Sequence, residues 1–335
     1  MRPLSCLYVA SSATPDDFMT AKGASRPLSI AFLGPVGTFS EEALFTQADF
    51  MTAEVVPMTS LADVLDSVSC GKVDIGFVPI ENSIEGTVNA TIDILVFEAE
   101  LLIQREVVFD VHLQLLAPPG ADLASVRRVL SFPVATAQCR TFLAEHLPDA
   151  EIIPTNSTAE SARLIGENLE PGTAALAPLL AADLYGLEVL AISVEDHSDN
   201  QTRFVAVARE GVPAPTGHDK TSIVCFQLAD SPGNLHRILG QFSARGINLT
   251  KLESRPTKRG LGDYCFIIDI EGHINDEVVA DCLRDLHAEL AGVKFLGSYP
   301  AAGDSGPAKR EALGAAKREA DEWLQSLRSQ VRHKT

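Results

Sequence analysis

The sequence lacks long hydrophobic runs and clusters of cysteine or histidine. None of its apolar stretches approaches the roughly 20 residues that a membrane helix requires, so we expect no membrane-spanning segment. Its six cysteines are scattered without metal-ligand spacing, which predicts small buried side chains in a reducing compartment and no metal site. Residues 1–27 lack a basic segment followed by an apolar core, so we expect no signal peptide and a cytoplasmic protein. We expect these residues to be a disordered extension, with an overcalled start and translation from Met19 as the alternative.

Positive charge is also scarce. The chain has 27 Lys and Arg against 45 Asp and Glu, a formal net charge of −18. This charge repels nucleic acid and anionic membranes, so we expect neither as a partner. An anionic substrate therefore needs a local group of Arg, Lys or helix N-termini. With 335 residues, 46% of them hydrophobic, the chain is long enough for about two to three domains.

Residues 28–210 repeat a pattern of strand, loop and helix, which is typical of an α/β domain. After the first apolar run comes a glycine loop, where Thr38 and Glu41 predict a capping box at the start of a helix. A second strand at 73–78 leads into a polar loop at 79–87, at the strand end where open α/β sheets place ligands. This loop is a candidate binding site.

The second half of this domain leaves the first lobe and then returns to it. A strand-like run at 101–117, broken at 105–106, marks the crossing into a second lobe. Ser157 and Glu160 predict another capping box there. The chain returns through a polar loop at 199–204. This path predicts a bilobal domain of the periplasmic-binding-protein type, with mostly parallel sheets and a cleft between the lobes.

Beyond this domain the pattern changes. Residues 211–220 have the glycine and proline content of a linker. Residues 221–300 read strand, helix, strand, strand, helix, strand, which predicts a ferredoxin-like βαββαβ domain. Residues 301–335 are rich in Ala, Lys, Arg and Glu and predict a charged tail or surface helix.

Five short motifs lie in the expected loops of the first domain, and two more, at 232–235 and 253–256, lie in the second domain. The five are Gly-Pro-Val-Gly-Thr-Phe-Ser at 34–40, Pro-Ile-Glu-Asn-Ser at 79–83 with Gly86, Ala-Gln-Cys at 137–139, Ser-Thr-Ala at 157–159, and Thr-Arg-Phe at 202–204. Together they resemble the prephenate dehydratase family, whose members convert prephenate to phenylpyruvate on the route to phenylalanine. The resemblance covers roughly residues 28–300 and includes an appended ACT regulatory domain.

The chain departs from the family pattern in two places. Many relatives have His-Pro-Gln shortly before Gln138, where this chain has Phe-Pro-Val at 132–134. The first ACT motif usually carries alanine where this chain has Asn234, so effector affinity or selectivity is expected to differ.

The resemblance implies a dianionic substrate that loses water and carbon dioxide while its ring becomes aromatic. Such a site needs an acid, an anchor for the surviving carboxylate and an apolar wall, and it needs no cofactor. Arg203 is the expected anchor because its guanidinium keeps its charge, and Thr202 is the expected donor to the departing hydroxyl. Glu81 is the expected proton source, because a carboxyl desolvated in a cleft can stay protonated near neutrality. The residues expected to bind or pack around the substrate are Thr38, Asn82, Ser83, Gly86, Gln138, Ser157, Thr158 and Phe204.

For the ACT domain the resemblance implies feedback by L-phenylalanine, bound at a subunit interface of a homodimer or homotetramer. A glycine turn at a helix start can bind an amino acid's carboxylate, while carbonyls and Glu253 face its ammonium. The expected effector residues are Pro232, Gly233, Asn234, Leu235, Glu253, Ser254, Arg255 and Pro256.

Other interpretations stay open at this point. Arogenate dehydratase, which acts on the amino form of the substrate, has the same pattern. A non-catalytic bilobal anion-binding protein with an ACT sensor would use the same cleft, but it has no need for Glu81 and Thr202 together. Glu81 would also suit a capping role for a helix that begins near Gly86. For the ACT domain, the alternative is a structural dimerisation module with no bound effector.

Overall fold

The structure is a computed structural model, and it describes residues 27–227, 231–258, 263–303 and 322–329. The expected extension at 1–27 therefore lies almost entirely outside the described residues, as does most of the tail at 301–335. The chain divides into two compact units, Met1–Pro79 with Asp110–Asn200 and Ile80–Phe109 with Gln201–Thr335. Strand β3 and the polar stretch at 199–204 each run from one unit into the other.

The first part of unit 1 is a parallel sheet with β1 at its centre, between β2 and β3. Strand β1 is almost wholly buried, as expected for an apolar run covered on both faces. Helix α2 buries Val64, Leu65 and Val68, which share one helical face, and its N-cap Ser60 accepts from the backbone N–H of Asp63. The elements are β1 (Ser29–Leu33), α1 (Phe39–Phe45), β2 (Glu54–Met58), α2 (Leu61–Ser69) and β3 (Ile75–Asn82).

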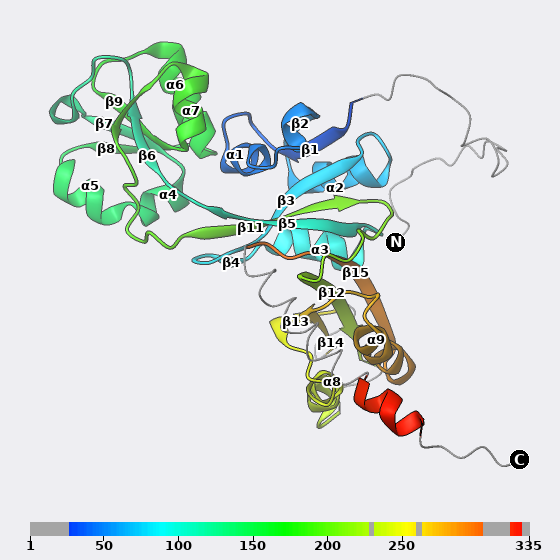
Figure 1. The fold of residues 1–335 in the computed structure, drawn as a ribbon. Helices are drawn as coiled ribbons and strands as arrows, with labels where there is room; N and C mark the ends of the chain where they lie inside the picture. Colours follow the sequence, from blue (N-terminus) through cyan, green and yellow to red (C-terminus); the bar gives the residue numbers. More distant parts are fainter. Residues whose placement is uncertain (1–26, 228–230, 259–262, 304–321, 330–335) are drawn as a thin grey trace, which may run out of the picture. The chain divides into compact units, whose positions relative to one another are not determined.

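The second part of unit 1 is a three-layer structure around a sheet of order β10-β6-β9-β7-β8 (Figure 1). Buried Leu176 of β9 packs in a cluster with α4 and α5, whereas its neighbour Ala175 packs in a cluster with α6 and α7. Because successive side chains of β9 point to opposite sides of the sheet, this strand contributes buried residues to the core on both sides. The elements are β6 (Gln114–Ala117), β7 (Arg128–Ser131), α4 (Pro133–Gln138), α5 (Arg140–His146), β8 (Glu151–Pro154), α6 (Thr158–Asn168), β9 (Thr173–Ala177), α7 (Leu179–Tyr185) and β10 (Glu188–Ala191).

This sheet is mixed, so the expectation of mostly parallel sheets was wrong for it. Strand β7 is parallel to β8 and β9, but β6 is antiparallel to both β9 and β10. The antiparallel pairs arise because β6 enters from β5 without a crossover helix, and β10 pairs back against β6 after α7.

Unit 2 begins with a short hairpin and two neighbouring strands. The last residues of β3 pair with β4, and β11 is the sheet neighbour of β5. The elements are β4 (Gly86–Thr87), α3 (Asn89–Phe97), β5 (Leu102–Asp110) and β11 (Gln201–Ala208).

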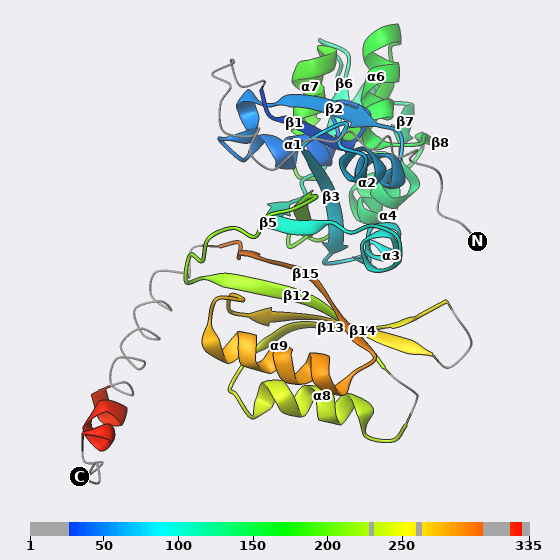
Figure 2. The same ribbon diagram turned by 90° about the vertical axis from the view of Figure 1, so that its right-hand side faces the viewer.

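The rest of unit 2 is the expected βαββαβ domain, an antiparallel sheet of order β13-β14-β12-β15 (Figure 2). Helices α8 and α9 cover one face, where Phe242 and Leu286 pack with Ile223 and Ile268. The opposite face carries polar and charged side chains. The elements are β12 (Asp219–Phe226), α8 (Asn234–Ser243), β13 (Leu249–Pro256), β14 (Tyr264–Glu271), α9 (Glu277–Glu289) and β15 (Gly292–Pro300). The fold class, α/β sheets plus a four-stranded antiparallel domain, is confirmed.

Three polar sites that the sequence placed in loops or breaks lie inside strands. Glu81 and Asn82 end β3, Thr202 and Arg203 begin β11, and Glu106 lies within β5, which is unbroken. The break expected at 105–106 was therefore wrong, and the expected loops at 79–87 and 199–204 are reduced to a turn at 83–85 and to residues 199–200. Strand pairing and buried polar partners, which are distant in the sequence, compensate these polar side chains.

The two expected capping boxes had different outcomes. Ser157 is the N-cap of α6 and accepts from the N–H of Glu160 at 3.0 Å, as expected. Thr38 is the N-cap of α1, but its hydroxyl donates to the carbonyl of Leu33 and makes no cap bond. Glu41 instead accepts from the N–H of Gly37, whose φ of +85° turns that donor toward the helix.

Glu42 of α1 provides a test of how burial affects stability in unit 1. Burial raises the pKa of Glu42 above its ordinary value of 4.5, although a backbone bond from Leu180 and the nearby His112 oppose the shift. A carboxyl with a raised pKa binds more protons in the folded state, so its ionisation lowers stability as pH rises through the folded pKa. We expect Glu42→Gln to raise the free energy of unfolding at pH 7.

The measurement is urea denaturation of wild type and Glu42→Gln at pH 7 and near pH 4. The gain should be larger at pH 7 than near pH 4, because a raised folded pKa costs stability only once the pH rises above the unfolded value. Equal stability of the two proteins at pH 7 would contradict the burial argument.

Candidate active site and effector pocket

Thr202 is held by Asn82 at the start of β11. The side-chain amide of Asn82 donates to the Thr202 hydroxyl at 2.9 Å and to the carbonyl of Gln201 at 3.2 Å. Its side-chain oxygen accepts from the N–H groups of Ile84 and Glu85. Because the Thr202 oxygen accepts a hydrogen bond, its own proton is available to a further acceptor, and donation to the oxygen polarises that O–H.

Ser83 extends this connection. Its N–H donates to the carbonyl of Gln201 at 2.8 Å, and its hydroxyl accepts from the N–H of Gln201 at 2.9 Å. Gly86 has a φ of +80° in the hairpin, a conformation that favours glycine. Phe204 is 2% exposed and packs in the core of β11. Asn82 therefore holds Thr202 directly, and Ser83 holds it through the neighbouring Gln201.

Arg203 lies in a buried ionic network. Its Nε donates to Glu106 at 2.7 Å, one terminal nitrogen donates to Asp269 at 2.6 Å, and the other donates to the Tyr299 hydroxyl at 2.8 Å. The side chains of Arg203, Glu106 and Asp269 are 11%, 0% and 4% exposed. Burial alone would lower the pKa of Arg203, but these neighbours outweigh it and raise the pKa above its ordinary value.

A second layer of contacts completes the network. Lys220 contacts Glu106 at 2.8 Å, and the Ser222 hydroxyl donates to Asp269 at 2.6 Å. Two cations thus balance two carboxylates, which is the condition for burying them. The network partners of Arg203 were not predicted from the sequence. The signal present was an acid within a largely apolar strand: Asp269 lies between isoleucines, and Glu106 lies between Arg105 and an apolar run.

Glu81 has two cations beside it. Its carboxylate lies 3.1 Å from the ammonium of Lys251 and 3.7 Å from the guanidinium of Arg203. The side chain is 40% exposed, so this environment is charged and partly open rather than the apolar cleft that the sequence indicated.

The remaining candidates lie in unit 1. The side-chain oxygen of Gln138, the last residue of α4, accepts from the amide of Asn200 at 3.2 Å. Thr158 is buried in the first turn of α6, next to the N-cap Ser157. Thr38 also belongs to unit 1, whereas residues 81–86 and 202–204 belong to unit 2. That the two sets line one cleft stays a prediction.

Cys139 follows Gln138 in its motif but is no nucleophile. Burial, with smaller contributions from Glu195 and Asp196, raises the pKa of its thiol to about 12. The thiolate is therefore scarce at neutral pH, and the side chain serves as a core residue.

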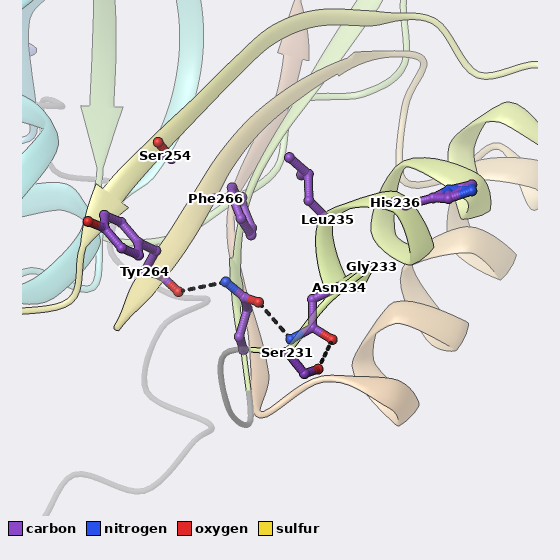
Figure 3. A pocket seen from close by; sticks show the side chains of 9 residues that line it. Ser231, Gly233, Asn234, Leu235, His236, Ser254, Tyr264 and Phe266 are labelled. Carbon is purple, nitrogen blue, oxygen red and sulfur yellow. Dashed lines mark hydrogen bonds between the residues drawn. The ribbon is translucent and has the colours of Figure 1, made fainter. Parts of the chain in front are cut away.

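A pocket of about 420 Å³ opens beside the start of α8 (Figure 3). Gly233, with a φ of +86°, precedes the helix, and Asn234 accepts from Ser231 and donates to Gln227. Of the expected effector residues, four line this pocket: Gly233, Asn234, Leu235 and Ser254. The other lining residues are Gln227, Ser231, His236, Tyr264 and Phe266.

Glu253 and Arg255 have other contacts. Glu253 accepts from the hydroxyl of Thr87 at 2.7 Å, and Arg255 contacts Asn89 and Asp93 of α3. They point away from the pocket because side chains alternate along β13, so only Ser254 of this motif faces the pocket.

Two further features are absent from the part of the chain that the structure describes. There, no group of three or more His, Cys, Asp or Glu side chains is arranged to hold a metal ion. Among those same residues, no helix is both long enough and apolar enough to cross a membrane.

Comparisons with known proteins agree with this arrangement. The sequence model described as prephenate dehydratase matches residues 30–212, and that of the ACT domain matches residues 221–288. A prephenate dehydratase of Mycolicibacterium vanbaalenii is 42% identical over 316 residues, covering 89% of this chain and 98% of the relative.

Two solved structures are similar along most of the chain. The prephenate dehydratase of Arthrobacter aurescens in complex with L-Phe has 41% identity and a TM-score of 0.76, covering 89% of this chain and all of that one. A protein described as GqqA, a novel type of quorum quenching acylase, has 32% identity and a TM-score of 0.74, covering 82% of this chain and 98% of that one.

Proposed function

Because the chain belongs to the prephenate dehydratase family and carries an ACT domain, we propose that it converts prephenate to phenylpyruvate under feedback control by L-phenylalanine. The observation that carries the reaction is the bond from Asn82 to Thr202, which leaves the Thr202 proton available for the leaving group. A binding protein has no need for such an oriented donor.

In the proposed reaction the ring carboxylate leaves as carbon dioxide, and the electron pair of its broken C–C bond enters the ring. The ring hydroxyl takes a proton and leaves as water, so the ring becomes aromatic. Thr202 donates to the departing hydroxyl. Threonine is too weak an acid to provide the proton alone, so Glu81, whose side chain is 40% exposed, would pass on a proton taken from water. Hydrogen-bond donors that are already fixed in place stabilise the negative charge of the transition state more than mobile water molecules do.

The proposed anchor for the surviving carboxylate is Arg203. A guanidinium has five N–H groups, and its three bonds within the network use three of them. The network would then hold the guanidinium plane fixed while a remaining N–H binds the substrate. The helix N-termini at Thr38 and Ser157, with Gln138 and Thr158, would complete the substrate contacts.

The deciding experiment is separate incubation of the protein with prephenate and with arogenate, following the loss of each. Faster loss of prephenate with appearance of phenylpyruvate is expected. Preferential loss of arogenate would favour the alternative dehydratase, and loss of neither would favour a binding protein. A third incubation with an acylated signalling molecule tests the activity named for one similar structure.

The proposed effector site is the pocket at Gly233. The first turn of α8 offers N–H groups to the carboxylate of phenylalanine, and Leu235 and Phe266 offer apolar surface to its ring. A structure of the Arthrobacter aurescens relative contains L-Phe, which supports this choice of effector. Asn234 occupies volume that the usual alanine would leave open, so selectivity among aromatic amino acids depends on it.

Gly233→Ala is expected to weaken phenylalanine binding at least about 5-fold, because a left-handed residue with a Cβ costs roughly 1 to 2 kcal/mol. Nothing lies within 4 Å of an added Cβ at this position, so the effect comes from the changed turn rather than a clash. Equilibrium dialysis measures it, with Gly240→Ala in the same helix as the matched control, where an added Cβ also meets nothing. Equal affinities of the two variants would count against this site.

We also propose a cytoplasmic homodimer or homotetramer. Strands β13 and β15 are the edges of the ACT sheet, and sheet edges favour pairing between copies. Light scattering of the purified protein distinguishes the two assemblies from a monomer.

A further inference from the structure

Strand β13 has two faces with different contacts. Ser254 is in register with Phe266, whose side chain packs on the helix-covered face of the sheet, and both line the effector pocket. Lys251, Glu253 and Arg255 alternate with it and point to the opposite face. Their side chains are only 9%, 20% and 14% exposed, so this charged face is largely covered.

What covers it is the segment that carries the candidate catalytic residues. The ammonium of Lys251 lies 3.1 Å from Glu81 and 3.4 Å from the hydroxyl of Thr87. Glu253 lies 3.6 Å from the same ammonium and accepts from Thr87. A lysine this buried needs carboxylate partners, and its two partners come from opposite sides, one from β3 and one from β13 itself.

Arg255 fixes the other end of this segment. It contacts Asp93 and Asn89 in α3, and Asp93 is also bonded to Lys258 at 2.8 Å. Residues 81–93 are thereby held to β13 at several points, so β13 and Glu81 cannot move independently.

We propose that Lys251 of the ACT domain is a positioning residue for Glu81, and that β13 thereby links the effector pocket to the catalytic residues. This inference rests on the proposed function of the same site. Lys251 and Ser254 are three residues apart, about 10 Å along a strand. A ligand that displaces Ser254 displaces Lys251 as well, and this alters the contact with Glu81. Such a differential contact is what coupling between two sites requires.

The test compares Lys251→Met, which keeps the length of the stem but removes the charge, with Lys251→Arg. Lys251→Met is expected to lower kcat for prephenate at least about 10-fold with little change in KM, and saturating phenylalanine should inhibit it less than wild type. Lys251→Arg should recover kcat to within about 3-fold, since it restores a cation at Glu81.

The matched control is Lys294→Met. Lys294 lies on the same sheet, is 15% exposed, and binds the carbonyl of Ala99 at 2.8 Å and Glu100 at 3.1 Å, away from Glu81. It should leave kcat near wild type. In a Glu81→Gln background, Lys251→Met should have no further effect on kcat, because the two residues act as one unit.

The outcomes separate this inference from the proposed function. An active wild type with Lys251→Met at full kcat, or with effects that add to those of Glu81→Gln, overturns the inference and leaves the function standing. An equal loss in Lys294→Met also overturns it, because it shows a general role in holding the domains together. A wild type that does not consume prephenate overturns both.

Discussion

Thr202→Ala is expected to lower kcat about 100- to 1,000-fold, the usual effect of losing one fixed donor at a developing charge. KM should change little, because the hydroxyl acts on the leaving group and not on the carboxylate anchor. The fold should persist, since Asn82 keeps its bonds to Gln201, Ile84 and Glu85 when the hydroxyl is removed. Phenylpyruvate absorbance measures the rate, and urea denaturation should place the free energy of unfolding within about 1 kcal/mol of wild type.

Thr202→Ser is the matched control, because it keeps the hydroxyl that Asn82 orients. It should retain activity within about 10-fold of wild type, since only the packing of one methyl group changes. Thr202→Val keeps the shape and removes the donor, so it should be as inactive as Thr202→Ala. A near-wild-type rate in either hydroxyl-free variant would refute the assignment of Thr202.

The position of Thr202 and Arg203 shows where sequence reasoning stops. A polar run between two apolar runs is the usual signature of a loop. Here it is the start of a strand, because Ser83 and Asn82 pair with it from 118 or more positions earlier. Periodicity within one segment contains no information about a partner so far away. The sequence marks Thr202 and Arg203 as candidates, but it does not reveal the contacts that orient them.

The order of strands and helices in the βαββαβ domain was predictable. Its helices have a clear apolar face, and glycine or proline marks most of its turns. The alternation of side chains along a strand also predicts that Ser254 points to one face of β13 and its neighbours Glu253 and Arg255 to the other. What it could not predict is that the charged face meets Glu81 and Asp93, because this contact joins segments far apart in the chain.

Glu106 is the clearest case of a misread charge. An acid beside an arginine within a long apolar run looks like a break, since a buried carboxylate alone is costly. The strand continues because Arg203 and Lys220, both distant in sequence, compensate this acid. A charged residue within an apolar strand therefore indicates a partner of opposite charge elsewhere in the sequence. For Glu106 that partner includes Arg203.

Arg203→Ala is expected to reduce both stability and substrate binding. Removing the guanidinium leaves the buried carboxylates of Glu106 and Asp269 short of a partner, which typically costs about 3 to 5 kcal/mol. If Arg203 also anchors the substrate, the loss of a charge-assisted bond should lower kcat/KM about 10- to 150-fold beyond any unfolding. Urea denaturation and steady-state kinetics on the folded fraction separate the two effects.

The variants Arg203→Lys and Asp269→Asn distinguish an anchor from a purely structural arginine. Lysine keeps the charge but cannot donate to Glu106, Asp269 and Tyr299 with the geometry of a guanidinium, so KM should rise through a misplaced cation. Asp269→Asn weakens the same network without removing the cation, so it should lower stability while KM stays within about 3-fold of wild type. Should both variants change KM equally at equal loss of stability, Arg203 acts through the network alone, and the anchor must be sought among the helix N-termini at Thr38 and Ser157.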